Sequence, residues 1–303
     1  MRPRVFGLFV LILVAFAGLA GTASAKKVKT ASKARYYLAL GDSLSQGQQP
    51  NLQGISSNTN EGYPDDLYQT ELRQIHSLQL VKLGCGGETS GSMITGKGNA
   101  DAAYNHCHPA GGSQLTAAVR FLKAHHRSGE VPLVTLDIGA NDVDPCATST
   151  DVGPCVSAGV SAISTNTPKI LDAIKKAAPK GTTFVEMNLY DPVLAGYFAP
   201  AGSTANQLAS ASQGLLQSVN NSIQTADSAA GVKIADVADA FDSYAPFSDT
   251  VAWEGQQIPL ALARVCAWTW ACSTPPSGPN IHANKNGYQV IANTFASVIG
   301  RLR

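Results

Sequence analysis

The chain has 303 residues and a net charge of +1, with 14% charged and 44% hydrophobic residues. A charge so close to balance gives no basis for binding nucleic acid or an anionic membrane surface. The length and the apolar content are those of one well-packed domain that buries a sizeable core.

The first 25 residues have the pattern of a secretory signal peptide. A basic start at residues 1–4 precedes an apolar run at residues 5–19 and three small residues at positions 23–25. The apolar run is shorter than the roughly 20 residues that a membrane span needs. We therefore expect cleavage after Ala25, a secreted (extracellular) protein and no stable membrane insertion afterwards.

Strands and helices alternate along the rest of the chain, in which we expect a basic tail at residues 26–35 and a single domain at residues 36–303. Apolar runs predict strands at residues 36–40, 78–83, 131–138, 183–189 and 232–237, and helical periodicity predicts helices at residues 65–74, 111–127, 156–178, 205–229 and 283–302. This alternation predicts an α/β fold, a three-layer α/β/α sandwich around a mainly parallel five-stranded sheet. Pro168 is expected to kink or divide its helix.

Three polar segments each follow the end of a predicted strand, where open α/β sheets bind their ligands. The first contains Ser43 in Gly41–Ser45, and its hydroxyl is a candidate nucleophile that needs an adjacent base. The second contains Gly87, whose backbone N–H can approach a ligand closely. The third contains Asn141, whose amide can donate to an oxyanion. Gly, Asp and Ser also form ordinary turns, so the first segment alone does not establish catalysis.

A candidate base lies near the end of the chain. His282 can act as both general base and general acid near neutral pH. The chain has no Gly-x-Ser-x-Gly around Ser43, which argues against the α/β-hydrolase design. It also has no His-Glu-x-x-His, phosphate-binding or dinucleotide-binding motif, so we expect neither a metal nor another cofactor.

These four segments, in this order, resemble the SGNH subgroup of the GDSL hydrolases, a family of serine esterases and lipases. The resemblance spans nearly the whole chain after residue 25. It implies an SGNH hydrolase-like, flavodoxin-like fold, with Ser43 as nucleophile and His282 as base. It also implies an oxyanion hole made by the backbone N–H groups of Ser43 and Gly87 and the side chain of Asn141.

One position departs from the family pattern, which places an aspartate three residues before the histidine. Here that position is Pro279, and Asn280 follows it. A histidine base still needs its other ring nitrogen held in the right tautomer. We expect a Ser43–His282 dyad oriented by the backbone carbonyl of Pro279, with the Asn280 side chain as second choice and a carboxylate from elsewhere as third.

Six cysteines in an exported chain predict three disulfides. Local proximity favours Cys85–Cys107, Cys146–Cys155 and Cys266–Cys272, and secreted members of the resembled family show the same sequential pattern. A metal site at His106-Cys107-His108 is a weaker alternative, because an oxidising compartment favours bridging of that cysteine.

A long segment, residues 238–279, contains all three tryptophans of the chain. It is expected to form a lid or pocket wall leading to His282, or else to pack its rings against the domain.

The leading hypothesis is a monomeric secreted esterase or lipase that hydrolyses a small-molecule or lipid ester through an acyl-enzyme on Ser43. A carbohydrate O-acetyl esterase or an acyltransferase could use the same residues. A wall- or glycan-binding protein is the non-enzymatic alternative, but binding alone does not need a serine paired with a base.

Overall fold

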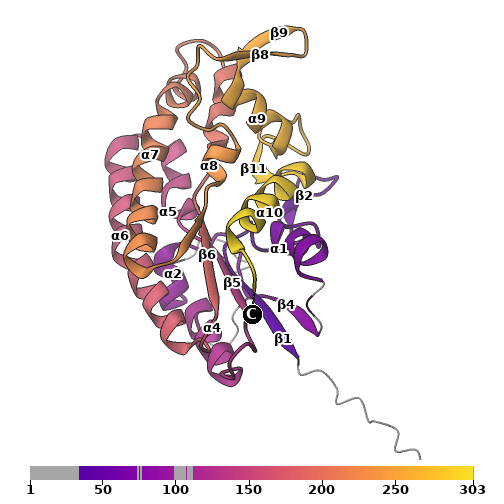
Figure 1. Ribbon diagram of the computed structural model, residues 1–303. Helices are drawn as coiled ribbons and strands as arrows, with labels where there is room; N and C mark the ends of the chain where they lie inside the picture. The colour runs from indigo at the N-terminus through magenta and orange to yellow at the C-terminus, as the bar shows by residue number, and fades with distance from the viewer. Residues whose placement is uncertain (1–33, 74, 76, 99–106, 108–111, 303) are drawn as a thin grey trace, which may run out of the picture. The chain divides into compact units, whose positions relative to one another are not determined.

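Five parallel strands form the central sheet of the protein, seen in the computed structural model of Figure 1. They are β1 (Arg35–Gly41), β4 (Leu78–Lys82), β5 (Leu133–Asp137), β6 (Thr183–Met187) and β7 (Lys233–Ala235). Their order in the sheet is β4-β1-β5-β6-β7, and every neighbouring pair is parallel. This order is that of flavodoxin-like folds, so the predicted fold class is confirmed.

The structure describes residues 34–302, apart from residues 74, 76, 99–106 and 108–111. The expected signal peptide and nearly all of the expected basic tail lie outside these residues. Arg35, which the sequence analysis placed in the tail, is the first residue of β1.

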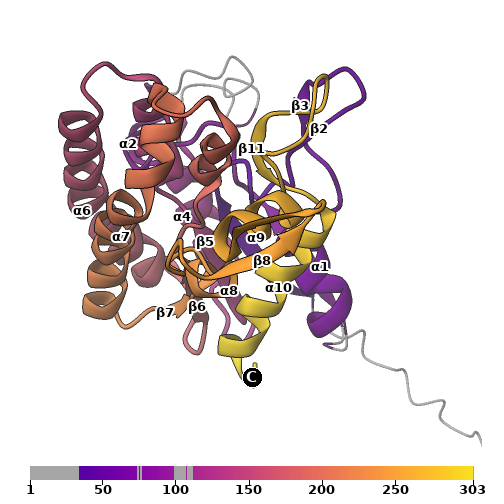
Figure 2. The same cartoon turned by 90° about the horizontal axis from the view of Figure 1, so that it is seen from above.

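Helices cover both faces of the sheet, as Figure 2 shows from above. One layer contains α2 (Ser90–Thr95), α4 (Gln114–Ala124), α5 (Ala140–Val143), α6 (Val152–Ala177) and α7 (Thr204–Ala230). The other contains α1 (Tyr63–Leu67), the π-helical turn η1 (Tyr68–Leu72), α8 (Val237–Ala240) and α10 (Lys285–Ile299).

Strand β1 shows how the two layers share the core. Tyr37 and Ala39 pack with α1 and α10, whereas Leu38 and Leu40 pack with α4 and α6. Successive strand residues point to opposite faces, so a strand covered by helices on both sides is apolar throughout. The continuous apolar run of β1 therefore follows from its central place in three layers.

Pro168 does not divide α6, which runs unbroken over 26 residues. Of the two outcomes expected for Pro168, a kink or a division of the helix, the division is wrong. A proline removes one backbone hydrogen bond. Helices in proteins are stabilised mainly by packing, and buried residues on both sides of Pro168, including Ile163 and Ile170, hold this helix together.

The segment between β7 and α10 contains small elements that the sequence analysis did not predict. They are β8 (Thr250–Trp253), β9 (Gln256–Pro259), α9 (Leu260–Trp268), β10 (Thr269–Trp270) and β11 (Asn280–Ala283). A hairpin formed by β2 (Gln49–Pro50) and β3 (Ser56–Ser57) lies in a stretch expected to be a loop. Strands this short carry too few residues for a periodic pattern.

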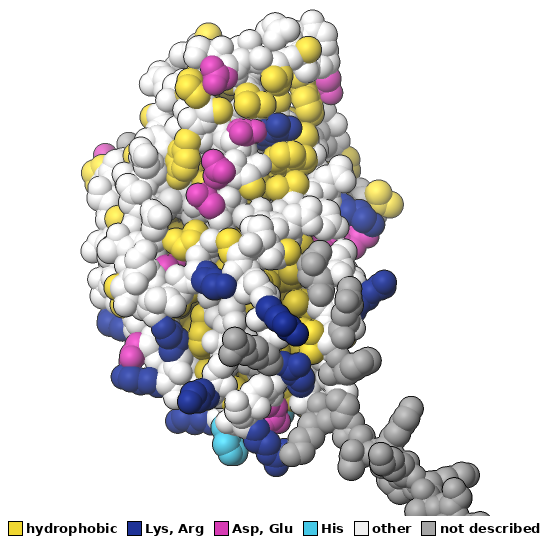
Figure 3. Space-filling view, viewed as in Figure 1, with side chains coloured by type: hydrophobic (Ala, Val, Ile, Leu, Met, Phe, Trp, Pro, Cys, Tyr) yellow, Lys and Arg dark blue, Asp and Glu magenta, His cyan; other side chains and the backbone are white. Residues whose placement is uncertain are grey.

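The surface of the described residues has separate charged and apolar regions. On the face of Figure 3, lysine and arginine gather at the lower end, while apolar and acidic side chains are more frequent at the upper end, near β8 and β9. Within the described residues, no helix combines the length and the apolar character that a bilayer span requires.

Three disulfides join the pairs that local proximity suggests, Cys85–Cys107, Cys146–Cys155 and Cys266–Cys272. Cys107 is therefore bridged rather than free for the alternative metal site; His106 and His108 lie outside the described residues.

We expect the Cys85–Cys107 bridge to stabilise the fold more than the Cys266–Cys272 bridge. The bridged cysteines are 22 and 6 residues apart, respectively, and the loop-entropy term then differs by about 1 kcal/mol. Replacing both cysteines of a pair by alanine should therefore lower Tm by about 2–4 °C more for the longer loop. Scanning calorimetry of the wild type and the two double-alanine variants under oxidising conditions gives the loss of Tm for each pair. The same three proteins under reducing conditions, in which every bridge is open, give the part of each loss that comes from side-chain packing. A larger bridge-dependent loss for Cys266 and Cys272 than for Cys85 and Cys107 would contradict this ranking.

Candidate active site

The turn after β1 holds Ser43 in a rigid framework. Gly41 has a φ of +135°, and a Cβ there would meet the carbonyl of Asp137 at 2.2 Å, so only glycine fits. Its N–H donates to Oε1 of Gln114 at 2.7 Å, and its carbonyl accepts from Nε2 at 2.8 Å. Next along the turn, Asp42 Oδ1 accepts the N–H of Leu44 at 2.9 Å. The Ser43 hydroxyl is thus held at the carboxyl end of β1.

A buried carboxyl beneath this turn supports it from β5. Asp137 Oδ2 accepts the N–H groups of Asp42 at 3.1 Å and Ser45 at 3.2 Å, and Oδ1 accepts the Tyr63 hydroxyl at 2.6 Å. Burial, reinforced by the neighbouring Asp42, raises the pKa of Asp137 well above its usual range. Burial also raises the pKa of Asp42 to about 6. Asp137 was not predicted as a site residue, because in the sequence it is one more residue of a buried strand.

The candidate oxyanion donors lie around the same turn. Asn141 Nδ2 donates to Asp42 Oδ2 and to the carbonyl of Glu88, both at 3.1 Å. These bonds place its amide between the turn that carries Ser43 and the segment that carries Gly87. Within the described part of the chain, the backbone N–H groups of Ser43 and Gly87 donate to no protein acceptor. They therefore remain available to a ligand oxygen.

His282 lies on β11, and its ring is held by Asn280. Nδ1 of His282 lies 2.7 Å from Asn280 Oδ1, which also accepts the backbone N–H of His282 at 3.0 Å. The expectation that the Pro279 carbonyl orients the ring is therefore wrong. Residues two apart on a strand project to the same face, so β11 places the side chains of Asn280 and His282 together. An amide oxygen accepts only, so Nδ1 carries the proton and Nε2 is the unprotonated nitrogen of the neutral ring.

Burial lowers the pKa of His282 to about 4. A base acts in its neutral form, which dominates above its pKa. We therefore expect the limb of kcat/KM that belongs to His282 to lie near pH 4, well below the value of about 6.5 for free histidine. Asn280→Asp places a carboxylate beside the ring and should move this limb upward, whereas limbs that belong to Asp42 or Asp144 should stay. Rate measurements on a soluble ester from pH 3.5 to 8 test both, and a wild-type limb at pH 6.5 that Asn280→Asp moves upward would contradict the lowered pKa of His282.

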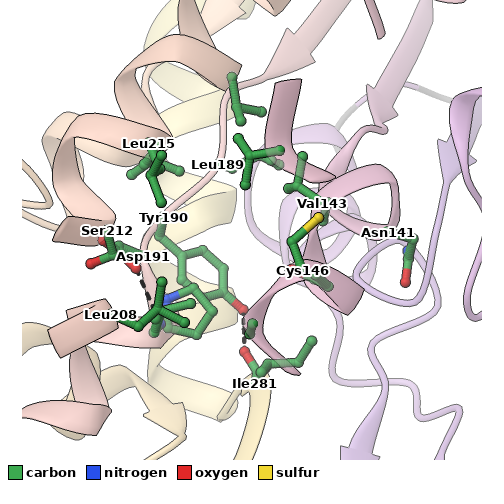
Figure 4. A pocket seen from close by; sticks show the side chains of 18 of the residues that line it. Asn141, Val143, Cys146, Leu189, Tyr190, Asp191, Leu208, Ser212, Leu215 and Ile281 are labelled. Carbon is green, nitrogen blue, oxygen red and sulfur yellow. Dashed lines mark hydrogen bonds between the residues drawn. The ribbon is translucent and has the colours of Figure 1, made fainter. Parts of the chain in front are cut away.

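A pocket beside Ser43 opens to solvent, and the space between its walls is about 860 Å³ with the adjoining open solvent included. Its walls come from α5, the 3-10 helices η2 (Asp144–Thr148) and η3 (Pro192–Phe198), and the starts of α6 and α7. Ser43, Asn141 and His282 line it together. The other lining side chains are mostly apolar and include Val143, Val156, Leu189, Leu208, Leu215, Leu216, Val219 and Ile281. Figure 4 shows Leu189, Leu208, Leu215 and Val143 around this space and the hydrogen bond from Tyr190 to the carbonyl of Ile281, 2.8 Å long.

The tryptophans pack in the domain rather than around this pocket. The ring of Trp268 meets Phe241 edge-on, with 5.1 Å between centroids, and Trp270 Nε1 donates to Gln49 Oε1 at 3.3 Å. None of the three is among the described residues that line the pocket. The rings therefore pack against the domain, which is the second of the two outcomes expected for residues 238–279.

A carboxyl on the pocket wall was also missed. Asp144 lies three residues after Asn141, so the turn from α5 into η2 carries both to the pocket. Burial, aided by the charges of Asp42 and Asp142, raises the pKa of Asp144 to about 7. The helical spacing from Asn141 is the one feature of the sequence that could have indicated it.

The described residues contain no group of three or more side chains suited to a metal ion.

Several solved structures have similar folds. A GDSL-like lipase from Parabacteroides merdae aligns at 15% identity with a TM-score of 0.52, covering 88% of this chain and 96% of its own. An extracellular lipase from Streptomyces rimosus gives 18% identity and a TM-score of 0.51, with coverages of 86% and 99%. Phospholipase A1 from Streptomyces albidoflavus aligns at 18% identity with a TM-score of 0.50, covering 86% of this chain and 99% of its own. At these identities the similarity establishes the fold alone.

No curated protein shows a significant sequence match to the chain. The model of the GDSL-like lipase/acylhydrolase family, however, matches residues 39–290, which include the Ser43 turn, Gly87, Asn141 and His282. The fold, the strand-end serine, the histidine that lines the same pocket and this match together place the chain in the GDSL-like lipase/acylhydrolase family.

Proposed function

We propose that the protein is a secreted serine esterase that hydrolyses carboxylic esters of apolar acids. Ser43 Oγ attacks the ester carbonyl while His282 Nε2 takes its proton. Asn280 Oδ1 holds the Nδ1 proton, so the ring carries one proton at rest and two in the tetrahedral intermediate. The intermediate then expels the alcohol, which receives the proton from His282. Water, activated by the same nitrogen, releases the acid from Ser43.

The developing oxyanion is stabilised by neutral donors. The N–H groups of Ser43 and Gly87 and the Asn141 amide supply this charge stabilisation without a metal ion. The imidazolium of His282 faces an amide oxygen instead of a carboxylate, so it is stabilised by a hydrogen bond and not by an ion pair. This arrangement fits the lowered pKa of His282.

The pocket beside Ser43 carries the proposal for the substrate. The mostly apolar lining suits an extended acyl chain, because each buried methylene contributes about 0.8 kcal/mol. An acetyl group would reach few of these apolar side chains, so the pocket favours a longer acyl group over carbohydrate deacetylation. Acyl transfer uses the same residues and differs only in the acceptor. Ser43 and His282 line the same pocket, and Asn280 holds the His282 ring. This arrangement argues against a protein that only binds glycans, because binding alone does not need it.

Secretion is part of the proposal. It is supported by the signal-peptide pattern of residues 1–25 and by three disulfides, which persist in oxidising compartments.

A panel of p-nitrophenyl esters from acetate to palmitate, beside an acetylated polysaccharide, tests the substrate class. We expect kcat/KM to rise about tenfold or more from acetate to octanoate, because the longer chain fills the pocket. Leu215→Trp should remove this preference by filling the pocket with an indole ring. Leu52→Trp, at a position 85% exposed, is the matched control. Faster release of acetate from the polysaccharide than of p-nitrophenol from any ester of the panel would overturn the assignment.

A further inference from the structure

Gln114, the first residue of α4, bonds to both segments that carry backbone oxyanion donors. Its Oε1 accepts the N–H of Gly41 at 2.7 Å, and its Nε2 donates to the carbonyl of Gly41 at 2.8 Å and to Oε2 of Glu88 at 3.0 Å. Gly41 lies two residues before Ser43. Glu88 directly follows Gly87. One side chain therefore joins the Ser43 turn to the Gly87 segment.

The bonds to Gly41 also determine which way the Gln114 amide faces. A backbone N–H only donates and a carbonyl oxygen only accepts, so a flipped amide would set N–H against N–H and oxygen against oxygen. Gln114 is 0% exposed. A buried donor without an acceptor is strongly unfavourable, so the amide keeps the orientation that directs an N–H to Glu88.

Gly87 lies between two points at which its segment is held. Before it, the N–H of Cys85 donates to the carbonyl of the last residue of β1 at 3.1 Å. After it, Glu88 is held through its carboxylate by Gln114 and through its carbonyl by Asn141. Gly87 itself has a φ of +71°, so the chain turns between these points. The direction of the Gly87 N–H therefore depends on the position of Glu88.

The bond from Gln114 differs from that of Asn141 in lasting through the reaction. The two N–H groups of Asn141 already donate to Asp42 and to the carbonyl of Glu88. An N–H that turns to the oxyanion leaves one of these acceptors. Gln114 is not among the described residues that line the pocket, so the substrate does not compete for its bonds. Gln114 is therefore the side chain that still holds Glu88 when charge develops on the substrate oxygen.

We propose that Gln114 is a positioning residue for the hydrolytic reaction, holding the N–H groups of Ser43 and Gly87 at the spacing that the oxyanion requires. The inference rests on the proposed function, because it concerns the transition state of that reaction. Donors stabilise the transition state only where they point at the developing charge. Without the bond from Gln114 to Glu88 the two segments can separate. The oxyanion then loses stabilisation, while binding of the ester in the pocket does not change.

Gln114→Met keeps the length of the side chain without its hydrogen bonds, and should lower kcat on p-nitrophenyl octanoate about ten- to thirtyfold with KM unchanged. A whole oxyanion donor is worth about a hundredfold or more, and a displaced donor loses part of that. Glu88→Met should give a similar loss, because it breaks the same link but leaves both bonds of Gln114 to Gly41. It carries the test alone if Gln114→Met does not fold. Glu88→Gln keeps an acceptor oxygen for Gln114 and should retain at least half of the wild-type kcat.

Gln213→Met is the matched control. Gln213 also bonds two backbone groups, the carbonyls of Ser243 and Ala245 at 2.9 Å each, and it does not line the pocket. This variant should lose Tm and keep the wild-type kcat. A loss of kcat as large as that of Gln114→Met would mean that any lost glutamine lowers the rate, and would overturn the inference.

An octyl trifluoromethyl ketone separates the geometry of the oxyanion donors from a general effect on the fold. Ser43 Oγ adds to its carbonyl carbon, His282 takes the serine proton, and the carbonyl oxygen becomes an oxyanion. The Ki of the ketone should rise in Gln114→Met and Glu88→Met by the factor by which kcat/KM falls. The Ki of 1-octanol, which fills the pocket without an oxyanion, should stay unchanged.

Titration of the reactive serine with a phosphonate ester gives the active fraction of each preparation, by which the rates are corrected. An unchanged Ki of the ketone, or a rate loss that disappears after this correction, would show that Gln114 serves the fold only and would overturn the proposal.

The double variant Gln114→Met/Glu88→Met tests whether the two residues act through their bond. A bond that is already broken cannot be lost twice, so kcat should equal that of Gln114→Met alone. A loss equal to the product of the two single losses would mean that the residues act independently, and would overturn the link.

The outcome for the wild type distinguishes this failure from failure of the proposed function. A wild-type protein that hydrolyses no ester overturns both. An active wild type whose Gln114→Met variant has the same kcat overturns only the role of Gln114.

Discussion

Ser43→Ala is expected to lower kcat on p-nitrophenyl octanoate by about a thousandfold or more, because no other group in the pocket replaces the attacking oxygen. The variant should keep its Tm, since the one hydrogen bond of the Ser43 hydroxyl within the described residues is a long contact of 3.4 Å to Asp42. Ser210→Ala, on an exposed turn of α7, is the control.

A serine-directed phosphonate ester provides an independent readout. It should add one label to the wild-type protein, on the peptide that contains Ser43, and none to Ser43→Ala. Residual hydrolysis above a few per cent in the variant, or labelling of another serine, would show that Ser43 is not the nucleophile.

His282→Ala should lower kcat by a similar factor, about a thousandfold, because the serine then loses its general base and the alcohol its general acid. Asn280→Ala should cost less, about ten- to a hundredfold, because the ring remains but its tautomer is no longer fixed. Steady-state rates on the same ester measure both losses. The size of the loss in Asn280→Ala distinguishes a ring held by Asn280 from a ring held by the carbonyl of Pro279. If the carbonyl of Pro279 held the ring, Asn280→Ala would change little.

A matched control for these variants is Asn221→Ala, which removes an exposed amide from α7. Full activity of His282→Ala with a normal Tm would exclude histidine as the base. Imidazole added to the buffer should partly restore His282→Ala if the variant has a cavity where the ring was, and should leave Ser43→Ala inactive.

The architecture of the domain could be predicted from local patterns. Apolar runs such as residues 36–40 must be buried on both faces, and helices between them force a parallel sheet. The strand ends then bring Ser43, Gly87 and Asn141 to one edge. Pairing of nearby cysteines also follows from chain proximity. These features depend on residues that are close in sequence or on rules that hold for every sheet of this class.

The partner of His282 could not be predicted in this way. The choice between Pro279 and Asn280 depends on whether residues 280–283 form a strand, and four residues carry no periodic pattern. Pairing with β10 makes them a strand, and the alternation of side chains then turns Asn280 toward His282. The long-range contact decides the local conformation.

The order of residues in the chain determined the fold class, the candidate nucleophile, the candidate base and the disulfide partners, because each is encoded by a motif or by neighbours along the chain. Only the folded structure decided the buried Asp137 beneath the Ser43 turn, the walls of the pocket beside Ser43 and the hydrogen bonds between Gln114 and Gly41, which are 73 residues apart. Such contacts depend on how separate elements pack, and packing leaves no trace in the spacing of residues along a single segment.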